Sequence, residues 1–303
     1  MGRAMKRKGK DQYEEVFLEL IRRASCDLPS DVEKALKKAF SREEGVSKET
    51  ISVILKNVKL AREKSLPICQ DTGLQNWKIR CPDSLDFEEI RHSIYEATKE
   101  ATEIGFLRPN AVEPVSNKNT GDNTGAFHPI IEMEPWGKNY LTVSLLLKGG
   151  GSENVSSQIS LPNEEIGAGR DLDGVRRAVL KMIHSAQGRG CSPGIAGICI
   201  GGDRQMGYRI AKAQLLKSLS SKNQNKVLAL LEKRIEEEAN QMGIGPMGFG
   251  GGTTILGVKI GWAERHPASF FVTMSYSCWA LRRWHLRCGI NGKNPVYSEN
   301  PFE

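Results

Sequence analysis

Leu66-Pro67-Ile68-Cys69-Gln70-Asp71-Thr72-Gly73 is the stretch on which the interpretation of this chain depends. Its cysteine is followed directly by an amide, a carboxylate, a hydroxyl and a glycine, a density of reactive groups that packing alone does not require. Two other cysteines have similar surroundings, in Cys191-Ser192-Pro193-Gly194 and in Cys278-Trp279-Ala280-Leu281-Arg282-Arg283. Three widely spaced thiols, each beside glycine, proline or arginine, predict one shared metal centre.

The sequence around these cysteines predicts a mixed α/β fold. Apolar residues at helical spacing and capping residues predict three helices before Cys69: from Tyr13 to Ala24, from Ser30 to Phe40, and from Ser47 to a point before Pro67. The same reasoning predicts helices over 87–104, 171–187, 209–219 and 226–242, and strands over 140–147 and within 253–274. We therefore expect a helical N-terminal part, then a mixed sheet with flanking helices, and the metal site in glycine-rich loops.

Composition and charge place the chain among globular proteins. Its 303 residues are 39% hydrophobic and 26% charged, and its apolar runs, such as Leu145-Leu146-Leu147, are far too short to cross a membrane. The net charge of +7 is concentrated before Asp11, so the rest is near neutral and nucleic-acid binding is not expected. We expect a basic disordered tail over 1–12, one unit over 13–290, and a polar tail over 291–303.

The seven cysteines do not form a regular disulfide pattern. Their odd number and the lack of a signal peptide favour a reducing compartment, and the cytoplasm is expected. Cys199, between two isoleucines, is expected to fill the core. Zinc sites usually show paired cysteines, and electron-transfer clusters usually take four. Three thiolates would leave one iron open as a Lewis acid, whereas a zinc-stabilised structural protein remains an alternative.

Glycine and arginine motifs indicate an anionic ligand. The stretch Gly149-Gly150-Gly151-Ser152-Glu153-Asn154 follows a strand, where successive amides can cradle a carboxylate. Arg108 is a second candidate, because arginine binds carboxylates through two hydrogen bonds. Gly243-Ile244-Gly245-Pro246-Met247-Gly248 has dinucleotide-type spacing but follows a charged helix, so a tight loop is expected there. These features also fit a protein that binds an anion without catalysis.

The order of the motifs resembles that of one known family. The matching motifs are Cys69-Gln70-Asp71-Thr72-Gly73, Arg108-Pro109-Asn110-Ala111-Val112, Asn123-Thr124-Gly125, Gly149 to Asn154, Gly243-Ile244-Gly245-Pro246, Gly250-Gly251-Gly252-Thr253-Thr254, Arg265-His266-Pro267 and Cys278 to Arg283. Their order is similar to that of class I fumarases, the iron–sulfur hydro-lyases that include the L(+)-tartrate dehydratase alpha subunit. The resemblance extends from about Val16 to Arg283.

The resemblance implies a [4Fe-4S] cluster and a dicarboxylate substrate. It implies that Cys69, Cys191 and Cys278 hold the cluster, and that Asp71 takes part in proton transfer. Substrate contacts are implied for Gln70, Arg108, Gly151 and His266. The implied reaction is the reversible hydration of fumarate to (S)-malate, with L(+)-tartrate dehydration as the alternative. A separate beta subunit and an (αβ)2 assembly are also implied.

Three positions depart from the family pattern. Ser192 stands where a proline is usual, Cys199 stands where a small residue or valine is commoner, and Ser218 to Asn225 lacks a frequent Arg-Asn-Pro loop. The last departure concerns a loop and a partner surface more than the cluster.

Overall fold

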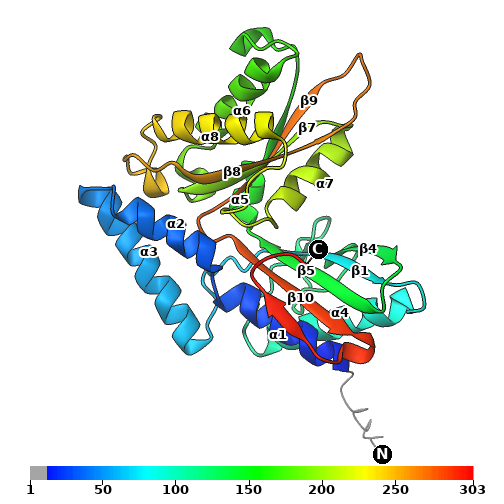
Figure 1. Cartoon of the computed structure of the whole chain (residues 1–303). Coiled ribbons are helices and arrows are strands. Elements are labelled where there is room, and N and C mark those ends of the chain that lie inside the picture. The colour runs from blue at the N-terminus through cyan, green and yellow to red at the C-terminus, as the bar shows by residue number, and fades with distance from the viewer. Residues whose placement is uncertain (1–11, 303) are drawn as a thin grey trace, which may run out of the picture.

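The computed structural model describes residues 12–302, and in it the chain forms two lobes, each built on one β-sheet (Figure 1). The first sheet has the order β11-β10-β5-β1-β4. Its strands are β1 (Leu74–Pro82), β4 (Ile130–Trp136), β5 (Tyr140–Lys148), β10 (Arg282–Gly289) and β11 (Val296–Ser298). Only β1 and β4 run parallel, so the sheet is mixed. Helices α1 (Gln12–Cys26) and α4 (Phe87–Glu103) pack together against it.

The second lobe contains a four-stranded sheet in the order β6-β9-β7-β8. Its strands are β6 (Ser157–Ser160), β7 (Gly194–Gly201), β8 (Ile255–Ala263) and β9 (Phe271–Ser277), and its helices are α6 (Leu172–Ala186), α7 (Arg204–Gln214) and α8 (Lys226–Asn240). Ala196, Ile198 and Ile200 pack in one core with α6 and α8. The other face of β7 meets α7, where a Cβ at Gly197 would lie 2.2 Å from the Ala211 carbonyl oxygen. Glycine there allows the close approach of α7.

The second lobe is inserted into the first. The chain leaves β5 through the short helix α5 (Gly150–Asn154), completes the second lobe, and returns from β9 directly into β10. Helices α2 (Ser30–Phe40) and α3 (Gly45–Lys64) pack against each other beside both lobes (Figure 1). Their apolar residues share a core with Leu146 of the first sheet and Ile195 of the second. The two lobes are therefore joined by a common apolar cluster as well as by two crossings of the chain.

Amphipathic patterns account for most of these elements. In α1, Tyr13, Phe17, Leu20 and Ile21 lie at helical spacing and are each 0–1% exposed. Phe17 packs edge to face on Trp77 of β1, with ring centroids 5.6 Å apart. The expected helical N-terminal part and the mixed sheets with flanking helices are confirmed.

Two of the predicted helix caps are wrong. Ser30 lies inside α2, which begins after Pro29, and its hydroxyl donates to Glu299 instead. Ser47 lies inside α3, and its hydroxyl donates to the carbonyl oxygen of Gly250, 2.6 Å away. Both hydroxyls satisfy distant segments of the chain, which local sequence does not reveal.

Two other boundaries differ from expectation. Gly150 to Asn154, expected as a loop, forms one short helix. Helix α7 covers Arg204–Gln214 rather than 209–219, and the Asp203 carboxylate caps its start by accepting from the Met206 amide at 2.7 Å.

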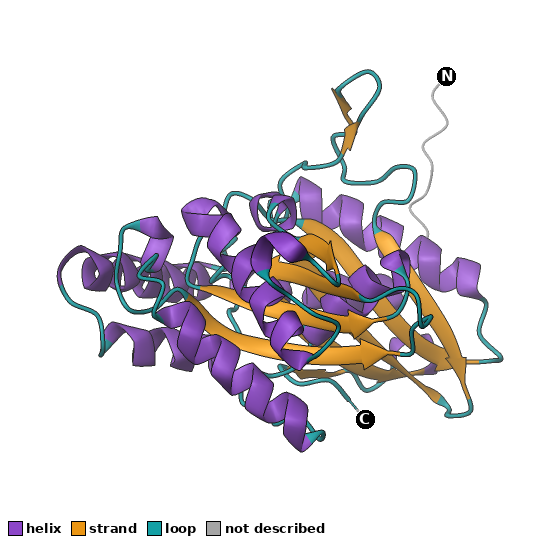
Figure 2. Cartoon of the chain, turned by 90° about the horizontal axis from the view of Figure 1, so that it is seen from above, coloured by secondary structure: helices purple, strands orange, loops and turns teal. Residues whose placement is uncertain are grey.

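The remaining elements are short. A hairpin of β2 (Val112–Glu113) and β3 (Lys118–Asn119) projects from the body (Figure 2). Four 3-10 turns are η1 (Glu164–Ile166), η2 (Gln187–Gly190), η3 (Pro246–Gly248) and η4 (Ile290–Gly292). Residues 1–11 of the expected basic tail lie outside the described residues, whereas 296–298 of the expected polar tail pair with β10. No helix between residues 12 and 302 is long and apolar enough to cross a membrane.

Candidate functional site

The three candidate cysteines lie where the two lobes meet. Cys69 is in the connection between α3 and β1, Cys191 lies between η2 and β7, and Cys278 follows β9. Antiparallel pairing of Ile195 with Ser277 brings the start of β7 beside the end of β9. The Trp279 amide also donates to the Cys191 carbonyl oxygen at 3.3 Å. The fold therefore places segments that are distant in sequence next to each other.

Exposure separates these cysteines from the rest. Cys69, Cys191 and Cys278 are partly exposed. The remaining four are each 0–1% exposed: Cys26, Cys81, Cys199 and Cys288. Cys199 is buried in β7, as expected for a core residue. Among the seven cysteines, only these three can therefore be reached by a group that enters from solvent.

The electrostatic environment couples these thiols to one another. Burial raises the pKa of Cys191, and the charges of Cys278, Cys69 and Asp71 raise it further. Burial also raises the pKa of Cys278, while Arg282 acts in the opposite direction and favours the thiolate. In the described part of the chain, no three His, Cys, Asp or Glu side chains are placed to hold one metal ion. An iron–sulfur cluster makes a different demand, since its cysteines bind different irons.

Asp71 lies in the same place and contacts the first turn of α5. Its carboxylate accepts from the Gly73 amide at 3.0 Å and from the Gly151 amide at 3.5 Å. A Cβ at Gly149 would lie 3.0 Å from Asp71 Oδ2, so glycine leaves room for this close approach. Arg282, which is 1% exposed, donates to the Asp71 carbonyl oxygen. The predicted amide cradle at Gly151 therefore faces the predicted proton-transfer group.

Gln70 and Arg108 lie together at the exposed edge of this region. Arg108 Nη1 is 3.5 Å from Gln70 Oε1, a long contact that a ligand can replace. The fully buried Thr72 holds the segment, because its hydroxyl accepts from the Arg108 amide at 3.1 Å and from Asn110 Nδ2 at 2.8 Å. The backbone of Arg108 is thus held in place, whereas its guanidinium makes only the long contact with Gln70.

Asn123 is a positioning residue, a role that the sequence did not indicate although Asn123-Thr124-Gly125 is one of the matching motifs. It is 3% exposed and has a positive φ of 59°. Its Oδ1 accepts from the Asn110 and Ala111 amides at 2.7 and 3.1 Å, and its Nδ2 donates to the Arg108 carbonyl oxygen at 2.7 Å. The local signal was an asparagine before Thr-Gly, a residue type that tolerates this backbone conformation.

A chain of ion pairs that begins at a buried lysine was also missed. Lys148, 2% exposed at the end of β5, pairs with Glu153 of α5 at 2.8 Å, and Glu153 pairs with Lys212 of α7 at 2.8 Å. Burial lowers the pKa of Lys148. Although burial acts in the opposite direction, Lys148 and Lys212 together hold the pKa of Glu153 below its usual value. The available signal was a lysine that ends an apolar strand.

Ser192 connects the Cys191 segment to the glycine loop over 243–248. Its hydroxyl is fully buried and donates to the Gly245 carbonyl oxygen at 2.6 Å, and its carbonyl oxygen accepts from the Met247 amide at 2.8 Å. This loop is a tight turn with η3, not the strand-to-helix turn of a dinucleotide site. Serine at this position therefore has a structural role in holding the Cys191 segment.

His266 does not join the other candidate residues. It is exposed in the connection between β8 and β9, and its Nδ1 accepts from the Ala268 amide at 3.1 Å. All seven residues of β9 separate it from Cys278. At 3.3 Å per residue, that strand places the two ends about 20 Å apart. Within one chain, His266 and the cysteines therefore lie at opposite ends of the second sheet.

Comparisons with known proteins identify the family of this chain. The sequence profile of the family described as "Fumarate hydratase (Fumerase)" matches residues 14–287. A "Putative fumarate hydratase class I" from Geobacillus stearothermophilus is 48% identical over 276 residues, which cover 89% of this chain and 54% of that protein. This chain therefore spans about half the length of that relative.

Two further relatives have nearly the same length as this chain. A "Putative L(+)-tartrate dehydratase subunit alpha" from Methanocaldococcus jannaschii is 36% identical, with 92% of this chain and 98% of that protein covered. The "L(+)-tartrate dehydratase subunit alpha" of Escherichia coli K12 is 29% identical, with 94% of each chain covered.

Proposed function

The chain belongs to the fumarate hydratase family of hydro-lyases, and on this premise we propose that it is the alpha subunit of an iron–sulfur enzyme that reversibly hydrates fumarate to (S)-malate. One observation carries the proposal: the three partly exposed thiols lie close enough to Asp71 for the pKa of Cys191 to respond to all of their charges. Three thiols could bind a metal cluster, and the carboxylate beside them could transfer a proton.

Cys69, Cys191 and Cys278 fit the donor set of a [4Fe-4S] cluster with one iron left open. Such a cluster, when bound, supplies a Lewis acid for the substrate hydroxyl. The neighbouring cations Arg282 and Lys148 favour the thiolate of Cys278. The chain thus offers three thiols and nearby positive charge in the same region.

The remaining steps fall to the side chains and amides around Asp71. Arg108 and Gln70 would bind one substrate carboxylate, because their contact is long and exposed. The amides of Gly73 and Gly151 orient the Asp71 carboxylate, which would hold or deliver the proton that moves with water. Because the Gly151 amide lies beside Asp71, it could also donate a hydrogen bond to an oxygen of the substrate.

We propose fumarate rather than tartrate as the substrate, because this chain is more similar in sequence to the relative named as a fumarate hydratase. That identity is 48%, against 36% and 29% to the two relatives named as tartrate dehydratase alpha subunits. Both substrates are dicarboxylates, so the same arginine, amide and carboxylate groups would serve either. L(+)-tartrate dehydration is therefore the second candidate.

A beta subunit is part of the proposal. Two relatives of nearly the same length are named as alpha subunits, whereas only 54% of the fumarate hydratase relative is covered by this chain. A substrate with a carboxylate at each end needs partners at both, and Arg108 with Gln70 serves one. We propose an (αβ)2 assembly, in which His266 would contact substrate in a neighbouring chain, since it lies far from the cysteines of its own.

Serine substitutions test the cluster ligands. Cys69→Ser, Cys191→Ser and Cys278→Ser should each lower iron and acid-labile sulfide after anaerobic purification, and each should abolish malate dehydration. Cys199→Ala is the matched control, because Cys199 is fully buried in β7 and should leave the iron content unchanged. Full cluster retention in any of the three serine variants would refute the assignment.

The partner requirement is tested separately. The chain alone, reconstituted anaerobically with iron and sulfide, is assayed with malate, fumarate and L(+)-tartrate, and no turnover is expected. Addition of a beta subunit should then produce turnover. Enzymatic rates without any partner would show that this chain carries a complete site.

A further inference from the structure

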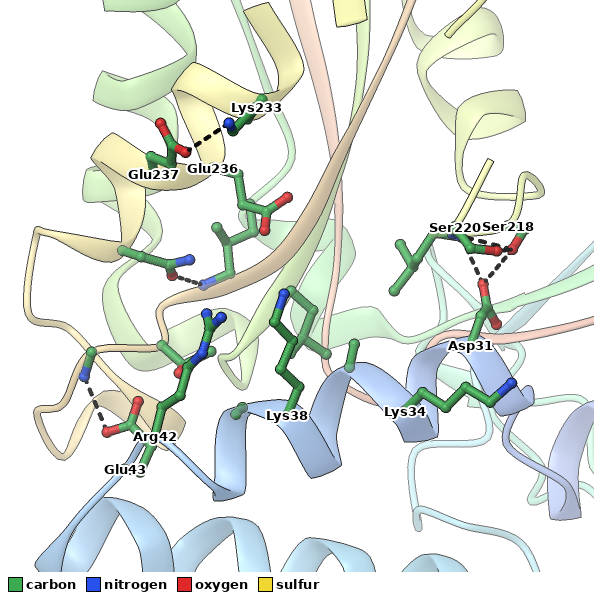
Figure 3. Close-up of a pocket in the computed structure, with 18 of the residues that line it drawn as sticks. Asp31, Lys34, Lys38, Arg42, Glu43, Ser218, Ser220, Lys233, Glu236 and Glu237 are labelled. Atoms are coloured by element: carbon green, nitrogen blue, oxygen red, sulfur yellow. Dashed lines mark hydrogen bonds and ion pairs between the residues drawn. The ribbon is translucent and has the colours of Figure 1, made fainter. Parts of the chain in front are cut away.

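Two large cavities lie away from the cysteines, and their charges differ. The cavity of Figure 3, about 920 Å³, lies between α2 and α8. Its lining has no excess of positive charge, because four cations stand against five carboxylates: Lys34, Lys38, Arg42 and Lys233 against Asp31, Glu43, Glu236, Glu237 and Glu299. The second cavity, about 1,010 Å³, shares Ser218 and Ser220 with the first. Of these two cavities, only the second has both a buried cation, Lys259, and a lining with net positive charge.

We call this second cavity the lysine cavity. Its charged lining residues are Lys217, Lys222, Lys259 and Glu232, and its polar lining residues are Gln214, Ser218, Ser220, Ser221, Asn223, Gln224, Asn225 and Asn300. The one carboxylate is already satisfied, because Glu232 Oε1 accepts from the Ile260 amide at 2.7 Å and from Asn223 Nδ2 at 2.8 Å. The lining therefore offers three ammonium groups and many hydrogen-bond donors to whatever fills it.

Lys259 is the strongest reason to expect a ligand. It projects from β8, is 6% exposed, and donates to the Ser221 carbonyl oxygen. Within residues 12–302, no carboxylate lies within 4 Å of its Nζ atom. Burial and the charge of Lys217 lower its pKa, and the carboxylates of Glu232, Glu236 and Asp31 oppose that shift from greater distances. A buried ammonium without an ion-pair partner is costly, and an anion in the cavity would remove that cost.

The loop that closes the lysine cavity is the segment that departs from the family pattern. Residues 218–225 connect α7 to α8 and supply most of the serine and amide groups of the lining. Asp31 of α2 fixes the start of this loop, accepting from the Ser218 hydroxyl at 3.0 Å and from the Leu219 amide at 2.6 Å (Figure 3). The loop is held in place by α2, so the cavity is built into the fold.

We propose that the lysine cavity binds a small multivalent oxyanion, either a phosphate compound or a polycarboxylate, at a site separate from the cysteines. Three ammonium groups match two or more negative charges, and serine hydroxyls with amide side chains match the remaining oxygens. The proposal does not depend on the reaction at the cysteines. Lys217 lies just after α7, whose Lys212 pairs with Glu153 near Lys148, so the anion would bind at the end of a helix that reaches the site.

The test measures anion binding to the full chain. Melting temperature and isothermal titration are recorded with inorganic phosphate and with citrate, against sodium chloride of equal ionic strength. We expect at least one of the two anions to bind and to raise the melting temperature. Phosphate without citrate would identify a phosphate site, and citrate without phosphate a polycarboxylate site. Absence of binding by both anions at millimolar concentration would overturn the proposal.

Variants assign the binding to the cavity. Lys259→Met should abolish the anion-dependent shift and raise the melting temperature in chloride, because the unpaired buried charge is gone. Lys217→Met combined with Lys222→Met changes only exposed side chains and should weaken binding at least tenfold. Lys181→Met, an exposed lysine of α6, and Arg108→Met, at the proposed substrate site, should both retain it. Unchanged binding in the cavity variants, or loss of binding in Arg108→Met, would overturn the assignment.

Discussion

Replacement of Asp31 by asparagine should destabilise the chain strongly, because it removes the partner of a buried cation. Arg283 of β10 is fully buried, and its Nη2 lies 2.5 Å from Asp31 Oδ2. Its Nε and Nη1 atoms have no hydrogen-bond partner in the described part of the chain. Asp31→Asn keeps the shape and removes only the charge.

The expected loss is about 3–5 kcal/mol in the free energy of unfolding, the usual cost of leaving one member of a buried ion pair uncompensated. A loss of 3 kcal/mol lowers the folding equilibrium constant about 100-fold. The Asp31 pKa supports this reading: burial would raise it, yet Arg283 and the Leu219 amide hold it below its usual value.

Urea unfolding followed by circular dichroism measures the effect. The control is Glu237→Gln, which breaks an exposed pair with Lys233 at 3.7 Å and should cost less than about 1 kcal/mol. The double variant Asp31→Asn with Arg283→Met should recover most of the loss, because it removes both charges. The buried ion pair does not stabilise the chain as expected if Asp31→Asn costs no more than the control, or if the losses of Asp31→Asn and Arg283→Met simply add in the double variant.

Three further predictions concern catalysis, pH and backbone geometry. Asp71→Asn should retain the cluster and lower kcat about 10²–10⁴-fold in the reconstituted enzyme; near-normal turnover would exclude Asp71 from proton transfer. His285 is fully buried, and burial lowers its pKa to about 3, so only the unfolded chain takes up its proton as the pH falls below about 6.5. Stability should therefore fall by roughly 2 kcal/mol more in the wild type than in His285→Gln between pH 7 and pH 5 in urea titrations, and equal slopes would contradict this. Gly245→Ala should cost at least about 2 kcal/mol, because φ is +67° and the new Cβ would lie 1.7 Å from the Gly250 oxygen. Gly243→Ala, with a similar φ and open space, should cost only about 1 kcal/mol, and similar unfolding midpoints for the two would show that the close contact relaxes.

The sequence predicted the features that depend on local pattern. Helices α1, α6 and α8 follow from apolar spacing within one segment, and β5 follows from a single apolar run. The separation of Cys69 and Cys191 from Cys199 also followed from local context, since Cys199 lies between isoleucines in a buried strand. Burial confirms the expected core position of Cys199.

The features that depend on distant contacts were not predicted. Thr72 and Asn123 hold Arg108 through hydrogen bonds that span 36 and 15 residues, and neither residue type is unusual in a loop. Lys148 pairs with Glu153 only because α5 turns back over the end of β5. The distance of His266 from the cysteines requires the pairing of β7 with β9, which apolar spacing alone does not give.

The insertion of the second lobe sets an order of assembly during synthesis. Residues 150–277 are continuous and can form their own core as soon as they leave the ribosome. β5 pairs with β10, which emerges more than 130 residues later, so one edge of β5 must wait unpaired. The strand with this unpaired edge carries Leu141, Val143 and Leu145, whose side chains are fully buried in the finished sheet. A nascent chain stalled before β10 therefore presents an apolar strand edge to other chains, and demand for chaperones should peak at that length.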